Sequence, residues 1–160
     1  MPRLEVLDPE SREFISNYRC REGGEPAWVR LDKPLNECKV TLITSSGLVR
    51  KSDTPFDLSN SGGDPTYRVI PSDSDPAELT LSIVSANWDR SGFMADVNVV
   101  FPMERLRELA NDKVIGSLAE NFYAFMGSIF QIDPVIEKSA PEVGRRLRDE
   151  RVDIALLVPV

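Results

Sequence analysis

Polar residues that follow predicted strands are the first candidates for chemistry in this sequence. Asp89, Asp96 and Asn98 lie in an irregular stretch after a predicted strand, where pocket residues of an α/β protein belong. Their carboxylate and amide groups could orient the ammonium or carboxylate group of a small substrate. The same residue types also serve well as caps of turns and of a following helix, and this structural role is an equal alternative.

Three further side chains are candidates for the same pocket. Ser45 and Ser46 precede Gly47 at the end of an earlier predicted strand, so the turn could offer backbone N–H groups to an anion. Without a fuller glycine pattern, such a segment is more often only a turn. Tyr123 could donate a hydrogen bond to a substrate, or it could pack in the core with its hydroxyl group satisfied.

The most common catalytic side chain is absent, because the sequence contains no histidine. This excludes Ser–His and Cys–His nucleophile pairs and all metal sites with histidine ligands. Cys20 and Cys38 do not form a Cys-x-x-Cys motif, which excludes a thioredoxin-type site and the usual zinc sites. The two thiols could pair or resolve a redox intermediate, although reduced and packed cysteines are expected in the cytosol. We expect no metal and no cofactor in this chain.

Charge and hydropathy limit the partners. With 19 basic and 26 acidic residues, the 160-residue chain has a net charge of −7, which argues against a nucleic-acid surface. It contains no apolar stretch of the roughly 20 residues that a membrane span needs, and its first residues do not resemble a signal peptide. We therefore expect a cytoplasmic protein that binds neither nucleic acid nor membrane.

Several elements must position the candidate residues. Residues 39–45 are rich in β-branched side chains, and residues 79–85 alternate between apolar and polar side chains. Both patterns predict strands. A helix should begin after Pro102, while the aromatic run 114–130 is interpreted as a turn, a short helical piece and core packing. Another helical region should begin at Asp133-Pro134.

That last helical region carries two further patterns. The spacing Ser139-Ala-Pro-Glu142 is that of a capping box, so we expect a helix to restart there. Ile136, Ala140, Val143 and Leu147 recur at steps of three and four residues, which predicts one buried face.

The C-terminal run 153–160 is almost entirely apolar, which is typical of a central parallel strand covered on both faces. Such a strand should lead into a loop and a helix, so the sequence is expected to end within an incomplete unit. We predict one domain over residues 1–160, with an irregular N-terminal segment at 1–36 and long loops at 51–78 and 87–101. The expected fold is α/β and Rossmann-like, with a mainly parallel sheet and helices on both faces.

From about Trp28 onward, short motifs occur in an order and spacing that resemble one family. The chain resembles the selenoprotein B family of glycine, sarcosine, betaine and D-proline reductases. The strongest motif is Asp96–Pro102, Asp-Val-Asn-Val-Val-Phe-Pro. The other segments with this resemblance are Lys33–Gly47, Pro55–Asp57, Gly63–Pro71, Arg105–Leu109, Ile115–Ala119, Phe125–Gly127 and Val152–Val160.

The resemblance implies a chemistry. In such proteins the strand resembling Ala155–Val160 leads directly into a selenocysteine or cysteine, usually with a second thiol nearby. The selenolate attacks the α-carbon of the substrate and displaces the amine, which a separate pyruvoyl-bearing subunit activates. Selenocysteine is encoded by UGA, which is otherwise read as a stop codon. We therefore expect that the sequence is a truncated translation and that the nucleophile lies beyond Val160.

The sequence also departs from the family. Relatives carry a His-x-His pair where this chain has Ser85 and Asn87, and often a third histidine where it has Phe122. These differences leave the substrate open.

The function expected from the resemblance is that of a selenoprotein B-like reductase component acting on a small amine or amino-acid-derived substrate. As 160 residues it should be inactive, and its partner should be a pyruvoyl-bearing or thiol electron-donor subunit. The alternative is a histidine-free, non-catalytic paralogue that binds a small ligand or a partner subunit. An exposed strand edge at Ile154–Val158 also predicts a homodimer.

Overall fold

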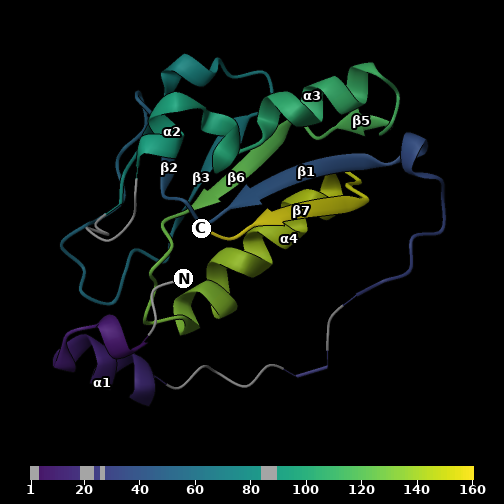
Figure 1. Cartoon of the computed structure of the whole chain (residues 1–160). Coiled ribbons are helices and arrows are strands. Elements are labelled where there is room, and N and C mark those ends of the chain that lie inside the picture. Colours follow the sequence, from purple (N-terminus) through teal and green to yellow (C-terminus); the bar gives the residue numbers. More distant parts are fainter. Residues whose placement is uncertain (1–3, 19–23, 26–27, 84–89) are drawn as a thin grey trace. The chain divides into compact units, whose positions relative to one another are not determined.

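The computed structural model describes residues 4–18, 24–25, 28–83 and 90–160, which fall into two compact units, Met1–Arg30 and Leu31–Val160 (Figure 1). The first unit contains the short 3-10 helix η1 (Leu4–Val6) and the helix α1 (Pro9–Asn17). The prediction of an irregular segment is therefore wrong for these residues. Asp8 caps α1 by accepting a hydrogen bond from the Ser11 N–H at 2.9 Å, with Pro9 in the first turn.

The second unit is built on a mainly parallel sheet centred on β1 (Lys39–Thr44). Along one edge, β1 pairs in parallel with β7 (Ile154–Val158) over five residues. Along its other edge it pairs in parallel with β5 (Ser117–Leu118) and then with β6 (Asn121–Phe125). Outside β6, the strand β3 (Tyr67–Pro71) runs antiparallel. The predicted α/β class with a mainly parallel sheet is confirmed.

A small second sheet accompanies the main one. It pairs β2 (Leu48–Arg50) with β4 (Leu79–Leu81) in antiparallel order. The strand predicted at 79–85 therefore exists but ends at Leu81 within the described residues, and positions 84 and 85 lie outside them.

The two predicted long loops carry short elements of their own. The stretch 51–78 contains β3 and the 3-10 helix η3 (Pro76–Glu78), and the described part of 87–101 contains α2 (Ser91–Ala95) and η4 (Val97–Val99). Their turn-forming residues concealed these elements, because a short strand or a single helical turn leaves little periodicity in a sequence.

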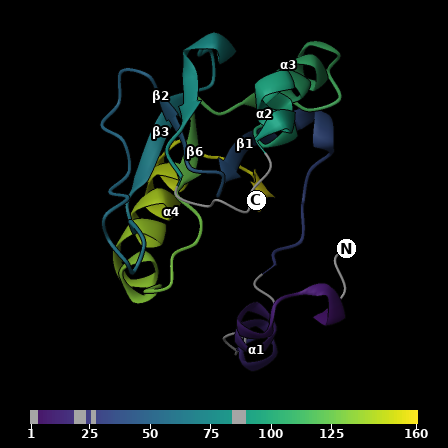
Figure 2. The ribbon, with the colours of Figure 1, turned by 60° about the vertical axis from the view of Figure 1, so that its left-hand side comes forward.

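Two longer helices cover opposite faces of the main sheet (Figure 2). The helix α3 (Met103–Asn111) begins after Pro102, as predicted, and buries Met103 and Leu106 against Val40, Leu42 and Phe122. The helix α4 (Ala140–Asp149) faces the alternate side chains of β1, β6 and β7. Because successive side chains of a strand point to opposite faces, the same strands contact both helices.

The interpretation of 114–130 as a turn and a helical piece is wrong, because this run contains β5 and β6. Phe122, Tyr123 and Ala124 are all buried, so both faces of β6 are covered. A short strand buried on both faces has no alternation of apolar and polar residues, and its pattern cannot be distinguished from that of a buried helix.

The capping box expected at Ser139 is also absent. A single π-helical turn, η5 (Val135–Ser139), continues directly into α4, and Ser139 has helical backbone angles. Its buried hydroxyl group donates a hydrogen bond to the Pro65 carbonyl at 2.6 Å. Ser139 therefore anchors the helix to the chain near β3 instead of capping its first turn.

The strand β7 is present and parallel, as predicted, but among the described residues its faces are only partly covered. Among the described residues it pairs only with β1, so its outer edge is open. Leu156 and Leu157 remain exposed, the latter by 65%.

No helix in the described part of the chain is long and apolar enough to cross a membrane.

Candidate functional site

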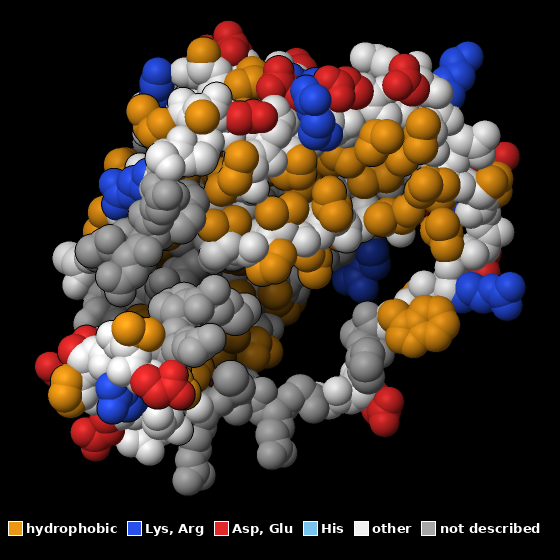
Figure 3. All heavy atoms as spheres, viewed as in Figure 1, with side chains coloured by type: hydrophobic (Ala, Val, Ile, Leu, Met, Phe, Trp, Pro, Cys, Tyr) orange, Lys and Arg blue, Asp and Glu red, His pale blue; other side chains and the backbone are white. Residues whose placement is uncertain are grey.

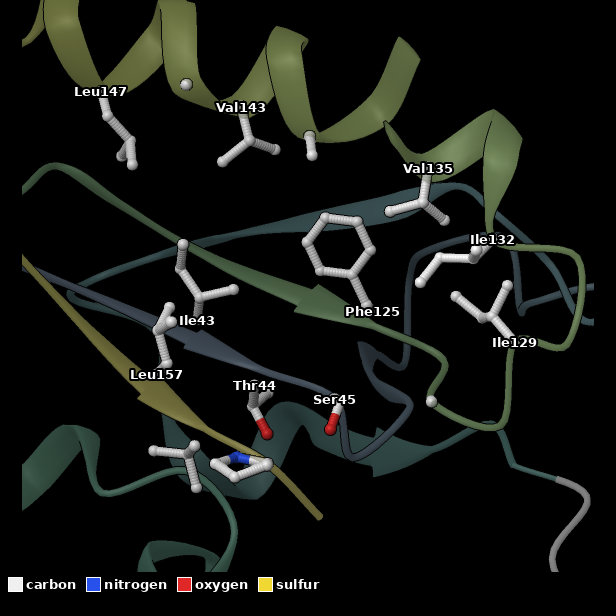
Figure 4. Close-up of a pocket in the computed structure, with 15 residues that line it drawn as sticks. Ile43, Thr44, Ser45, Phe125, Ile129, Ile132, Val135, Val143, Leu147 and Leu157 are labelled. Atoms are coloured by element: carbon white, nitrogen blue, oxygen red, sulfur yellow. The ribbon is translucent and has the colours of Figure 1, made fainter. Parts of the chain in front are cut away.

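An apolar cavity of about 580 Å³ lies between α4 and the sheet (Figure 4). It lies where the parallel strands β1, β6 and β7 end, which is the usual ligand edge of an open α/β sheet. The side chains labelled there point into the space from both the helix and the strands. They include Ile43, Phe125, Ile129, Ile132, Val135, Val143, Leu147 and Leu157.

Small residues on α4 explain why this space is not filled. Ala140 and Gly144 lie one turn apart on the helix and both line the cavity, so neither reaches across to the sheet. A Cβ atom added at Gly144 would meet no atom within 4 Å. The cavity therefore follows directly from two small residues at helical spacing opposite large ones on the strands.

Gly144 provides the first prediction. In the Gly144→Ala variant we expect the free energy of unfolding to rise by about 0.5–1 kcal/mol, because alanine favours the helix and its Cβ enters open space. Urea-induced unfolding followed by far-UV circular dichroism measures this change. The matched control is Gly116→Ala, which should destabilise the chain, because the new Cβ would lie 2.6 Å from the Glu37 carbonyl carbon. If both variants stabilised the chain, or both destabilised it, the described packing at these two glycines would be wrong.

Among the candidate residues predicted from the sequence, Ser45 lines the cavity. It also forms hydrogen bonds between the end of β1 and the end of β7. Its hydroxyl oxygen accepts a hydrogen bond from the Val160 N–H at 3.0 Å. The same hydroxyl group donates a longer hydrogen bond, of 3.5 Å, to the Val160 carbonyl oxygen. Its backbone N–H donates to the Val158 carbonyl at 3.2 Å. Ser45 thus fixes the carboxyl end of β7 beside that of β1.

Ser46 and Thr44 lie at the same strand end, but their hydroxyl groups point into the protein. Ser46 is fully buried, and the Thr44 hydroxyl lies 3.1 Å from the Ser46 hydroxyl and 2.9 Å from the Val100 carbonyl. The Ser46 N–H donates back to Thr44 at 3.2 Å. These bonds close the turn internally. In this conformation neither hydroxyl group nor the Ser46 N–H is presented to a ligand.

Asp96 and Asn98 lie on the other side of the sheet, where they organise the start of α3. The Asp96 carboxylate accepts hydrogen bonds from the N–H and the amide group of Asn98, both at 2.8 Å, and these bonds lower the pKa of Asp96. Asn98 also donates to the Glu104 carboxylate at 2.7 Å and accepts from the Glu104 N–H at 3.1 Å. This is the capping arrangement that the sequence left as the alternative to substrate binding.

A second cavity, of about 470 Å³, adjoins Asp96 and Glu104 and is also lined by Lys51 and Phe93. Ser45 and Asp96, both predicted site residues, therefore line different cavities. Asp89 lies outside the described residues.

Tyr123 is 1% exposed on β6, and its ring packs against Tyr67 with the centroids 5.9 Å apart. Burial raises the pKa of the Tyr123 hydroxyl, with the negative charge of Glu150 as a second cause. The pKa of Tyr67 is likewise raised by burial and by its hydrogen bond to Glu142. Both phenols therefore stay protonated at neutral pH, which makes them hydrogen-bond donors and not bases.

Two further groups were considered in the sequence. Cys38 is a buried free thiol, 3.3 Å from the Pro34 carbonyl, as expected for a packed cysteine, while Cys20 lies outside the described residues. Within the residues that the structure describes, no group of three or more acidic, cysteine or histidine side chains could hold a metal ion.

Sequence reasoning missed that the main cavity is apolar. The signal was present in the helical spacing of Ala140, Val143 and Leu147, all of which line it. Ile136, the fourth member of the predicted buried face, is 47% exposed and belongs to the π-helical turn, which shifts the register of the face.

Comparisons of the sequence with known proteins place this chain in a family. The sequence profile described as glycine/sarcosine/betaine reductase selenoprotein B matches residues 10–159. No solved structure gives a significant match.

Three curated relatives share the resemblance. The D-proline reductase subunit gamma of Acetoanaerobium sticklandii is 33% identical over 132 residues, which are 82% of this chain and 52% of that protein. The glycine reductase complex component B subunit gamma of Symbiobacterium thermophilum is 27% identical over 125 residues (78% and 29%). The sarcosine reductase complex component B subunit beta of Peptoclostridium acidaminophilum is 32% identical over 98 residues (60% and 22%).

The chain spans about half the length of the first relative and less than a third of the other two. Because the family profile nevertheless covers almost all of its residues, the chain belongs to the glycine/sarcosine/betaine reductase selenoprotein B family.

Proposed function

We propose that this chain is a selenoprotein B-like component of a cytoplasmic reductase that acts on a small amine or amino-acid-derived substrate. Family membership and the names of the relatives support this class of activity. The structural observation that carries the proposal is the two hydrogen bonds between Ser45 and Val160. They fix the chain after β7 at the ligand edge of the sheet. The Rossmann-like character of the sheet is part of the same proposal.

The nucleophile, in this proposal, is a selenocysteine or cysteine that follows Val160 in a longer polypeptide. A residue in that position would emerge at the mouth of the apolar cavity, because Val158 and Pro159 already line it. Its selenolate or thiolate would form a bond to the substrate α-carbon while the carbon–nitrogen bond breaks and the amine leaves with the electron pair. A thiol electron-donor subunit would supply the two electrons that release the product, and a pyruvoyl-bearing subunit would activate the amine.

The cavity suits only the apolar part of such a substrate. Its walls are almost wholly apolar, so it would hold the carbon skeleton and exclude water from the reacting bond. The charged ends of the substrate would need other groups, for which Ser45, the predicted residue that lines this cavity, is the proposed candidate, while Asp96 lines the other cavity. Opening of the Ser46 turn would be required before that residue could contribute.

One observation favours the second function, that of a non-catalytic paralogue binding a small ligand or a partner subunit. Asn98 donates hydrogen bonds to both Asp96 and Glu104 and accepts one from the Glu104 N–H, so Asp96 and Asn98 already have protein partners. In that case the apolar cavity would serve binding alone.

The decisive experiment reads the DNA beyond codon 160 and compares it with the intact mass of the protein purified from its native cells. We expect a TGA codon, an open frame encoding a loop thiol and a helix, and a mass well above 17.9 kDa. A TAA or TAG codon together with a native mass of 17.9 kDa would remove the missing nucleophile and favour the binding function.

A further inference from the structure

The π-helical turn that precedes α4 has a local cause in the sequence, the proline at position 141. In a continuous α-helix, residue 141 would donate its N–H to the carbonyl group of Glu137, four residues earlier. Pro141 has no N–H, and its ring would collide with that carbonyl group. The wider π turn moves the carbonyl group away from the ring. In the structure the Ala140 N–H bonds to the Val135 carbonyl, five residues earlier, and Pro141 lies in the first turn of α4.

The residues around this turn are held at both ends by the same short loop. The N–H groups of Phe130 and Gln131 both donate to the Gly62 carbonyl at 3.0 Å. At the other end, the buried Ser139 hydroxyl donates to the Pro65 carbonyl at 2.6 Å. Because both ends are fixed, the extra residue of the π turn cannot move along the chain without breaking one of these bonds.

The π turn decides which side chain at the start of the helix faces the sheet. Val135 and Ala140 both line the apolar cavity, as does Val143 one turn further on. With regular α-helical spacing Ile136 would take the place of Val135, because residues four apart lie on one face. In the structure Ile136 lies outside the cavity lining and is 47% exposed.

The position of Ile136 in the turn says more than its exposure does. Figure 3 shows that hydrophobic side chains also gather on the surface over β1 and β7, so an exposed apolar side chain is not unusual in this chain. The five-residue spacing between Val135 and Ala140 is the unusual feature, since π turns are rare and often lie at functional sites.

We propose that Pro141 is a specificity-determining residue, which imposes the π turn and so places Val135 instead of Ile136 in the cavity wall. Val135 extends toward the Phe125 ring (Figure 4). Isoleucine has one more methylene group than valine, so a regular helix would narrow the cavity beside this ring. The consequence for the size of the substrate skeleton rests on the proposed function, whereas the register of the helix does not.

Cysteine labelling of the 160-residue chain reads this register. In a Cys20→Ser background, Val135→Cys and Ile136→Cys are reacted separately with a bulky, charged maleimide that the apolar cavity does not admit. Cys38 is buried and should not react. We expect the thiol at position 136 to react faster than the thiol at position 135.

The same two thiols are then labelled in chains that carry a second substitution. In Pro141→Ala the order of the two rates should reverse, because alanine restores the N–H donor, removes the ring and favours the α-helix. The matched control is Pro134→Ala, at the other end of the π turn, which should keep the wild-type order. Ser139→Ala should also keep it, because the proline remains.

Several outcomes would overturn the proposal. An unchanged order in Pro141→Ala would show that the proline does not impose the turn. A reversal in both proline variants would show only a general loosening of the helix start. A reversal in Ser139→Ala without one in Pro141→Ala would assign the turn to the bond with Pro65.

Far-UV circular dichroism checks that the variants fold. Pro141→Glu provides a second replacement with an N–H group, and its carboxylate suits the first turn of a helix. Loss of the fold in both replacements would overturn the proposal as well, because the restored donor should support an α-helix. None of these measurements needs the nucleophile or a substrate, so this inference and the proposed function can fail separately.

Discussion

Replacing Gly127 by alanine is expected to lower the free energy of unfolding by about 3 kcal/mol. Gly127 has a φ of +72°, a left-handed conformation that costs an L-residue energy. A Cβ atom at this position would also collide with the backbone carbonyl oxygen of Ser45. Since backbone cannot move aside as a side chain can, both penalties should appear in urea-induced unfolding monitored by circular dichroism.

The neighbouring residue supplies the control for this prediction. Ser128 also has a positive φ, of 46°, but it is not a glycine. Ser128→Gly should therefore leave stability unchanged or raise it slightly, because glycine adopts this conformation without steric cost. If Gly127→Ala lowered the free energy of unfolding no more than Ser128→Gly does, the described close approach of Gly127 to the Ser45 carbonyl would be wrong.

The second large effect is expected at Asp64, which is 6% exposed. Its carboxylate accepts hydrogen bonds from the Asp57 N–H and the Thr66 N–H, both at 2.8 Å, and lies 3.8 Å from the Arg68 guanidinium. Asp64→Ala would remove the acceptor of these partly buried hydrogen bonds and would leave the largely buried Arg68 guanidinium without its carboxylate partner. We expect a loss of about 2–4 kcal/mol, measured by the same unfolding experiment.

Asp64 also makes a prediction about pH. Burial would raise the pKa of its carboxyl group, but the hydrogen bonds from Thr66 and Asp57 and the charge of Arg68 outweigh burial and lower it. A lowered folded-state pKa stabilises the protein above the unfolded value of about 3.9, and this stability is lost as the pH falls through the folded-state value.

The isosteric variant Asp64→Asn isolates this contribution. The stability difference between wild type and Asp64→Asn should be constant above about pH 5 and should shrink below about pH 4, since the other carboxylates are common to both proteins. A difference that stays constant down to pH 2–3 would mean that the carboxylate charge of Asp64 contributes nothing.

The strands and helices with strong local patterns were predictable. β1 is rich in β-branched residues, α3 follows a proline and has a regular apolar stripe, and β7 is an unbroken apolar run. Each of these patterns arises within the element itself, which is why sequence reasoning finds them.

The remaining features depend on neighbours distant in sequence. β6 is covered on both faces and so shows no alternation, and Ser139 bonds to Pro65, a contact that no local spacing reveals. Whether β7 is central or at an edge depends on a strand that its own residues do not encode.

The candidate site was only partly predictable for the same reason. The sequence correctly indicated Ser45 as a residue at the end of a parallel strand, and the structure adds its bonds to Val160. It could not separate Asp96 from Ser45, because Asp96 caps the short helix η4 while Ser45 follows β1, and only the fold shows that these two positions line different cavities.

The central position of β1 has a consequence for the newly made chain. The pairing of β1 with β7 can begin only after Asp153 has been synthesised, and Asp153 follows its hydrogen-bond partner Lys39 by 114 residues. At a synthesis rate of about 5–20 residues per second, this interval lasts roughly ten seconds. For most of that time neither edge of β1 is paired, because β5 and β6, its partners on the other edge, are also made long after it. During synthesis, β1 is therefore an unpaired apolar strand, the kind of segment through which nascent chains aggregate.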